Sequence, residues 1–171
     1  FVAIATVAGL FILSLFAGSL PIDFGSPSGD AGQRIPDLGA AIHISRDESH
    51  PPYNSVPATS GWHYSDSGAP TRWGVHSEVV PDEVLVHNLE HGGVGVHYNC
   101  PDGCDNLILK LTEVVKQGSK VILSPYPDMD SIIALTAWNY IDNFDELDEL
   151  RIADFINAHM NSHNAPEWQA P

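Results

Sequence analysis

The stretch "PDEVLVHNLEHGGVGVHYNC", residues 81–100, carries the clearest structural pattern in the chain. Pro81 suits the first position of a helix, and the two acidic residues after it suit the positive N-terminal end of a helix dipole. Gly92 suits the residue that follows the last helical turn. We therefore predict a helix over residues 81–91 and a strand over residues 94–100, with the double glycine forming the turn between them.

Hydrophobic patterns on both sides of this stretch predict further elements. Apolar residues at a helical period predict a helix over 105–118 and an amphipathic helix over 145–160. Short apolar runs predict strands over 40–44, 120–124 and 131–138, the last of them rich in β-branched residues. This order predicts an α/β or α+β domain with a small mixed sheet and two or three packed helices.

The first part of the chain predicts a membrane anchor. Residues 1–22 are almost entirely apolar and carry no charge, and a helix of about 20 such residues spans a hydrocarbon layer of about 30 Å. Residues 23–38 are rich in Pro, Gly, Ser and Asp and predict a linker, followed by a globular domain over 39–171. No basic cluster follows the apolar segment, so the positive-inside tendency places this domain on the extracytoplasmic side, either periplasmic or at the cell surface.

The composition limits the partners of the chain. Its 22 acidic and 7 basic residues give a formal net charge of -15 in 171 residues. Such a surface cannot neutralise phosphates, so we expect no nucleic-acid partner. It suits cationic proteins, metal ions or a saline medium.

The two cysteines lie close together, in the sequence "CPDGC". In an oxidising compartment, a disulfide between Cys100 and Cys104 across the Pro-Asp-Gly turn is the first expectation. A C-x-x-x-C pair also ligates metal ions or remains as free thiols, and both alternatives stay open.

Histidines concentrate in and around the opening stretch. On the predicted helix, His87 and His91 lie four residues apart and share one face, which is the spacing of a chelating pair for zinc or copper. His97 follows on the predicted strand, which the double glycine can fold back beside the end of the helix. His63 belongs to a long aromatic loop, residues 50–74, that can close over the same place.

Glu90, between the two helical histidines, either binds the ion or orients a histidine. The remaining histidines are expected to be structural residues with ordinary hydrogen bonds: His43, His50, His76, His159 and His163.

The residues "HNLEH" also match H-x-x-E-H, an inverted zinc-peptidase motif in which the glutamate activates a zinc-bound water. Glu146 or Glu149 can be offered as the further downstream acid. However, the predicted helix is short and ends at two glycines directly after the second histidine. We therefore expect metal binding rather than peptide hydrolysis.

Three segments resemble, in order and spacing, a family of bacterial and archaeal membrane-anchored proteins known only as domain of unknown function family 3105. They are "YNSVPATSGWHY" (53–64), "VHNLEHGGVGVHYNC" (86–100) and "LTAWNYIDNFDELDELRIADFINAHMNSHNAPEW" (135–168), and the resemblance covers residues 32–168. Trp62 departs from the family pattern, which usually has Pro there. The resemblance implies no reaction, but it includes in its motifs His63, His87, Asn88, Glu90, His91, His97 and Tyr98.

These observations predict a membrane-anchored, extracytoplasmic metal-binding domain, acting as an accessory subunit beside other membrane proteins. Copper is preferred over zinc, because the site is rich in imidazole and has no paired carboxylates. The ligands are expected among His63, His87, Glu90, His91 and His97. The alternative is a scaffold without metal, either in a membrane assembly or in a filament resembling a type IV pilin, although Ala5 replaces the glutamate expected there.

Overall fold

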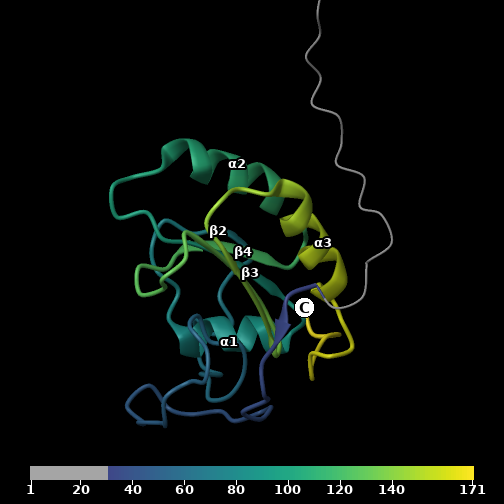
Figure 1. Ribbon diagram of the computed structural model, residues 1–171. Coiled ribbons are helices and arrows are strands. Elements are labelled where there is room, and N and C mark those ends of the chain that lie inside the picture. The colour runs from purple at the N-terminus through teal and green to yellow at the C-terminus, as the bar shows by residue number, and fades with distance from the viewer. Residues whose placement is uncertain (1–30) are drawn as a thin grey trace, which may run out of the picture.

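The computed structural model describes residues 31–171, and in that part of the chain a mixed sheet is built in the order β1-β6-β5-β3-β4-β2 (Figure 1). Its strands are β1 (Gln33–Arg34), β2 (Gly74–Val75), β3 (Val94–Tyr98), β4 (Val121–Pro125), β5 (Ile133–Ala137) and β6 (Tyr140–Phe144). The helices described are α1 (Asp82–Glu90), α2 (Asp105–Val115) and α3 (Glu149–His159). The predicted mixed sheet with packed helices is confirmed.

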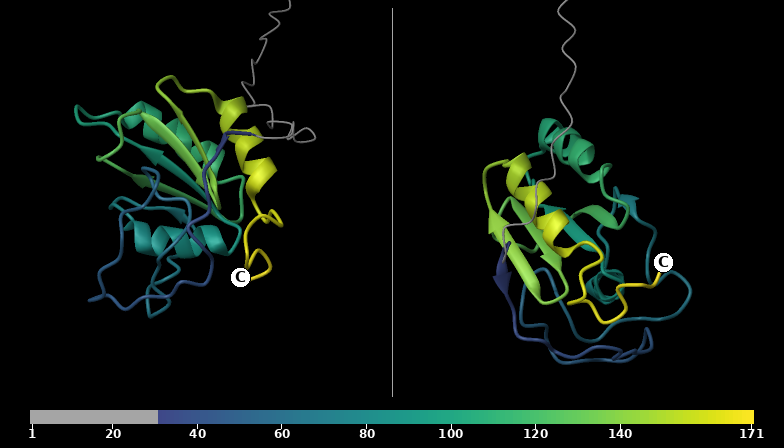
Figure 2. Two further views of the ribbon diagram at one scale, coloured as in Figure 1. Left: turned by 60° about the horizontal axis from the view of Figure 1, so that its bottom comes forward. Right: turned by 90° about the vertical axis from the view of Figure 1, so that its right-hand side faces the viewer.

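The two faces of the sheet are covered by different helices. Helices α2 and α3 lie on one face and α1 lies on the other (Figure 2). Alternate residues of β4 follow this division: Val121 and Leu123 join the core under α2 and α3, whereas Ile122 joins the core under α1. The sheet is therefore buried on both faces, which explains the continuous apolar runs of β4 and β5.

The centre of the sheet is a strand–helix–strand unit followed by a hairpin. β3 and β4 are parallel and are connected through α2, whereas β5 pairs antiparallel with β3 and then with β6. The hairpin turns at Asn139, whose positive φ of 64° is a conformation that asparagine tolerates better than most residues. This arrangement places the start of β3 directly after the end of α1.

Apart from the two-residue strand β2, the chain between β1 and α1 forms loops that wrap around that helix (Figure 1). The predicted strand over 40–44 is absent; only a single bridge links His43 to His63. Ala41 adopts a φ of 53°, which interrupts an extended conformation. The fully buried side-chain amide of Asn88 exchanges two hydrogen bonds with the backbone of Thr71, and this contact holds the end of the loop on α1.

The ends of the described region are tied to the rest of the domain. β1 pairs with β6, so the sheet already begins inside the segment for which the sequence predicts a linker. The C-terminal segment crosses the end of α1, where the Lys120 ammonium donates to the carbonyls of His91, Trp168 and Ala170 at 3.0, 3.1 and 2.5 Å.

No helix among residues 31–171 is long and apolar enough to cross a membrane. The helix predicted over residues 1–22 lies outside the described residues. The predicted disulfide is confirmed: Cys100 and Cys104 are bonded, with their Cα atoms 5.8 Å apart.

Phe155 of α3 provides a test of how the core is built. Its ring is fully buried in the core between α3 and the sheet. We expect Phe155→Ala to lower the free energy of unfolding by about 3–5 kcal/mol, because it removes a large apolar side chain and leaves a cavity. Urea denaturation followed by circular dichroism measures the change.

Leu150→Ala is the matched control on the same helix, since the Leu150 side chain is 65% exposed. We expect it to change the free energy of unfolding by no more than about 0.5 kcal/mol. Equal effects of the two substitutions would contradict the described packing of α3.

Candidate metal centre

Helix α1 and the loop that wraps around it bring several metal-binding side chains together. His87 and Glu90 lie three residues apart on α1 and therefore share a face. The opposite side of the cluster comes from the loop, where backbone hydrogen bonds join His63 to Ile42 at 3.1 Å and to Ile44 at 2.9 Å. This pairing places His43 beside His63, with ring centroids 4.8 Å apart.

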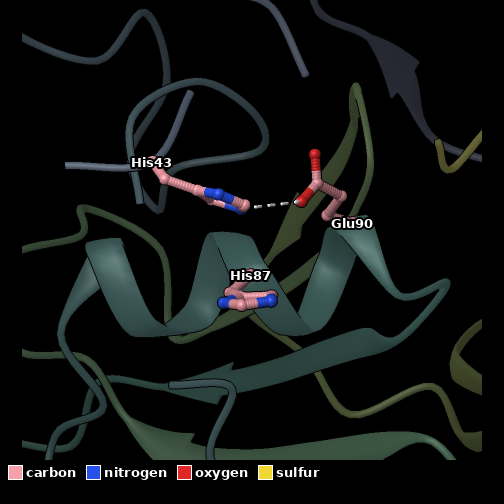
Figure 3. A group of neighbouring side chains, drawn as sticks. All are labelled: His43, His87 and Glu90. Carbon is pink, nitrogen blue, oxygen red and sulfur yellow. Dashed lines mark ion pairs between the residues drawn. The ribbon is translucent and has the colours of Figure 1, made fainter. Parts of the chain in front are cut away.

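The donor atoms of three of these residues converge. One ligand atom each from His43, His87 and Glu90 lies within 4.8 Å of the other two (Figure 3). His43 Nε2 lies 4.0 Å from Glu90 Oε2, and the His63 Nε2 atom lies only 2.9 Å from the same carboxylate oxygen. The cluster thus combines three imidazoles and one carboxylate, which is a donor set that suits zinc or copper(II).

Backbone carbonyls fix the orientation of two of these imidazoles. The Nδ1–H of His87 donates to the Tyr64 carbonyl at 2.5 Å, and the Nδ1–H of His63 donates to the Gly61 carbonyl at 2.8 Å. A carbonyl oxygen can only accept, so Nδ1 carries a proton in both rings. The Nε2 atom of each ring is the one left for the cluster, as in most metal-binding histidines.

The contact between His63 and Glu90 leaves one buried polar atom of each side chain without a hydrogen bond in the described part of the chain. Both side chains are fully buried, and Glu90 Oε1 accepts a hydrogen bond from the Ala41 N–H at 2.6 Å. In contrast, Glu90 Oε2 and His63 Nε2 form a close ion pair at 2.9 Å but no well-aligned hydrogen bond within residues 31–171. Two lone-pair-bearing atoms at this distance repel each other unless a proton or a cation lies between them.

The electrostatic environment favours a carboxylate facing the imidazoles. Burial raises the pKa of Glu90, but His63 and the Ala41 N–H outweigh it, so the net shift is downward. Burial likewise lowers the pKa of His63, and the Glu90 carboxylate and the Gly61 carbonyl more than reverse this effect. The pKa of His87 is lowered, mainly by burial and further by neighbouring histidines, so its ring keeps a lone pair at neutral pH.

His91 shares the side of α1 that carries His87, yet its ring nitrogens face another segment. The two rings pack edge to face with centroids 4.7 Å apart. His91 Nε2 lies 3.4 Å from Glu167 Oε2, and His91 Nδ1 lies 3.3 Å from the Pro171 carbonyl. His91 is therefore turned toward the C-terminal segment and does not belong to the three converging donors. Its assignment as a ligand stays a prediction.

His97, the other predicted ligand, lies inside the sheet region. Its Nδ1 is 3.2 Å from Ser124 Oγ and its Nε2 is 3.0 Å from Thr136 Oγ1, so both ring nitrogens are engaged by hydroxyl groups. Burial lowers the pKa of His97 to about 3, which keeps the imidazole neutral in the folded protein. The structure does not bring His97 into the cluster.

His43 is the cluster residue that sequence reasoning did not select. We expected an ordinary structural histidine, but its side chain is 43% exposed and its Nε2 atom faces Glu90. Its partners are 44 and 47 residues away along the chain, at positions 87 and 90. No spacing rule connects such positions; the bridge between residues 43 and 63 and the Ala41–Glu90 hydrogen bond bring them together.

A family model described as "Protein of unknown function (DUF3105)" matches residues 43–171. This match spans more than half of the chain, and the chain belongs to this family. All members of the cluster lie inside the matched region: His43, His63, His87 and Glu90. No curated protein matches the chain, and neither does any solved structure.

The buried position of His97 predicts a specific loss of stability in acid. The unfolded chain takes up a proton at His97 near pH 6.5, whereas the folded protein does so only near pH 3. Stability is therefore lost as the pH falls from about 6.5 toward about 3, by up to about 1.4 kcal/mol per pH unit. His97→Gln should remove this part of the pH dependence in urea denaturation series between about pH 6 and about pH 4.

His163→Gln is the matched control, because His163 is exposed and lies outside the sheet region. It should keep the acid dependence of the wild-type chain. The same acid dependence in His97→Gln and in the wild type would show that His97 is not held neutral by burial.

Proposed function

We propose that this member of the DUF3105 family binds one transition-metal ion in the cluster on α1 and acts as a membrane-anchored, extracytoplasmic accessory subunit of a membrane complex. His43, His87 and Glu90 provide the first three donors. His63 supplies the fourth, because its Nε2 atom faces the same Glu90 oxygen as His43 Nε2 does. Copper(II) is the preferred ion and zinc is the alternative.

One observation carries this proposal more than any other: the buried pair formed by Glu90 Oε2 and His63 Nε2. Buried polar atoms in folded proteins almost always have a partner, and each exception calls for an explanation such as an ion. A cation bound to both atoms takes the place of the proton that His63 Nε2 otherwise holds toward Glu90, and it satisfies both lone pairs at once. It also balances the carboxylate charge in a place that water does not reach.

The chemistry of the donors supports copper(II). The cluster offers imidazole nitrogens and a carboxylate oxygen, and these donors bind Cu²⁺ more tightly than Zn²⁺ at equal availability. It contains no thiolate or thioether, the ligands preferred by copper(I). Both cysteines are joined in the disulfide, so they contribute no thiolate while they are oxidised.

Closing the site around an ion requires a small movement. Metal–ligand bonds of about 2.0–2.1 Å place two donor atoms no more than about 4.2 Å apart. In the structure, the donor atoms of His43, His87 and Glu90 lie within 4.8 Å of one another. The exposed His43 ring is the natural moving part, because no hydrogen bond in the described residues holds it. Its exposure also provides the path by which an ion reaches the buried donors.

The position of Glu90 supports binding rather than peptide hydrolysis. In the H-x-x-E-H peptidase mechanism, both histidines bind zinc and the glutamate stays free to activate water. Here Glu90 is itself one of the converging donors, while His91 faces Glu167. The roles that the motif requires are therefore not reproduced.

Isothermal titration of the metal-free chain with CuCl₂ and ZnCl₂ tests the proposal. We expect one equivalent of metal per chain, with Cu²⁺ displacing Zn²⁺ in competition. His87→Ala should weaken binding by at least about 100-fold, because it removes a donor whose orientation is fixed. His43→Ala should weaken it by about 10- to 100-fold.

Two variants serve as controls. His163→Ala removes an exposed imidazole outside the cluster, and His97→Gln removes the buried one that the cluster does not include. Both should bind metal as the wild type does. If His87→Ala and Glu90→Gln also bind metal like the wild type, the metal site is wrong and a scaffold role without metal replaces it.

A further inference from the structure

The Cys100–Cys104 disulfide lies directly before α2, a position that crosslinking the fold does not require. It lies in the loop between β3 and α2, inside the parallel strand–helix–strand unit formed with β4. It links residues only four apart, so it closes a very short loop and constrains little of the unfolded chain. Both cysteines are partly exposed, and the Pro-Asp-Gly residues between them are exposed.

Cys104 occupies the residue that caps the N-terminus of α2. The helix spans 11 residues, and no side chain donates or accepts a capping hydrogen bond at Cys104. The unpaired N–H groups and the dipole at a helix N-terminus stabilise a negative charge, and they lower the pKa of a thiol placed there. A thiolate on Cys104 would therefore be a good leaving group.

Cys100 faces a surface where another chain can approach. It lines a cleft of about 470 Å³ together with Val79, Tyr98, Asn99, Pro101, Pro125 and Pro127. The Val79 side chain is 47% exposed although it is apolar. A cleft lined mainly by apolar residues and by one cysteine of the disulfide suits the docking of a polypeptide segment beside that cysteine.

We infer that Cys100 and Cys104 form a redox-active pair that exchanges with a dithiol of a partner protein. A thiolate of the partner attacks Cys100 Sγ, the bond between the two sulfurs breaks, and Cys104 leaves as a thiolate at the start of α2. The second thiol of the partner then attacks the mixed disulfide. The partner is oxidised to a disulfide, and Cys100 and Cys104 take up two electrons and two protons.

The inference rests on observations separate from the metal cluster. A cysteine pair beside a strand–helix–strand unit is also the placement of thioredoxin-like redox motifs, although three residues rather than two separate the cysteines here. Asp105, in the first turn of α2, opposes both the approaching and the leaving thiolate. The site is therefore suited to a partner thiol in a basic or neutral surrounding.

The rate of reduction by dithiothreitol tests this inference. The chain of residues 1–171 is compared with an oxidised peptide of residues 98–107, which keeps the disulfide but lacks the sheet and the helix. Free thiols are trapped with a polyethylene glycol maleimide and counted by gel shift. We expect reduction to be at least about tenfold faster in the folded chain, because α2 stabilises the leaving thiolate.

Two charge variants identify the cause of any difference. Asp105→Asn should raise the rate about two- to threefold, by removing a negative charge beside the leaving sulfur. Glu113→Gln removes an equal charge near the other end of the same helix and should leave the rate unchanged. Reduction that is no faster in the folded chain than in the peptide would overturn the inference and leave a structural disulfide.

Discussion

The Glu90 carboxylate has no contact with solvent, so its charge must be balanced by the groups that the fold places around it. It accepts a hydrogen bond from Ala41 and faces His63, while the backbone carbonyl of the same residue accepts one from Glu167. The loop before α1 and the C-terminal segment thus both depend on a single residue near the end of a nine-residue helix. Local folding and the chemistry of the cluster cannot be separated here, because one side chain supports both.

The need to balance the buried Glu90 carboxylate explains why the long loop has a defined path without regular secondary structure. Its backbone is held at separate points, among them the bridge between His43 and His63, the Asn88 side chain and the contact with Glu90. Two of these points, the bridge at His43 and the Ala41–Glu90 hydrogen bond, fix an imidazole or a carboxylate near α1. An ion in the cluster would join the loop to the helix directly, so binding would stabilise the fold as a whole.

The sequence predicts those elements and contacts whose signals lie within a short stretch of the chain. Periodicity and capping residues predict the helix before the double glycine, β3, α2, β4, β5 and the C-terminal helix. The short spacing of the two cysteines predicts the disulfide. β1, β2 and β6 were not predicted, because β1 and β2 have two residues each and β6 has one buried residue, Ile141, among partly and fully exposed ones. In the cluster, His87, Glu90 and His63 were selected from motifs. His43 was not, because its contacts depend on a loop path that no periodicity encodes.

The three lysines of the chain are placed very unequally. Lys110 lies on α2 and Lys116 directly follows that helix, both with exposed ammonium groups, whereas Lys120 is engaged by three carbonyls. Amine-reactive reagents will therefore act on the side chains near α2 first. If the protein is coupled to a biosensor surface through its lysines, it will be attached near α2. The opposite face of the sheet, with α1, will then point toward the solution.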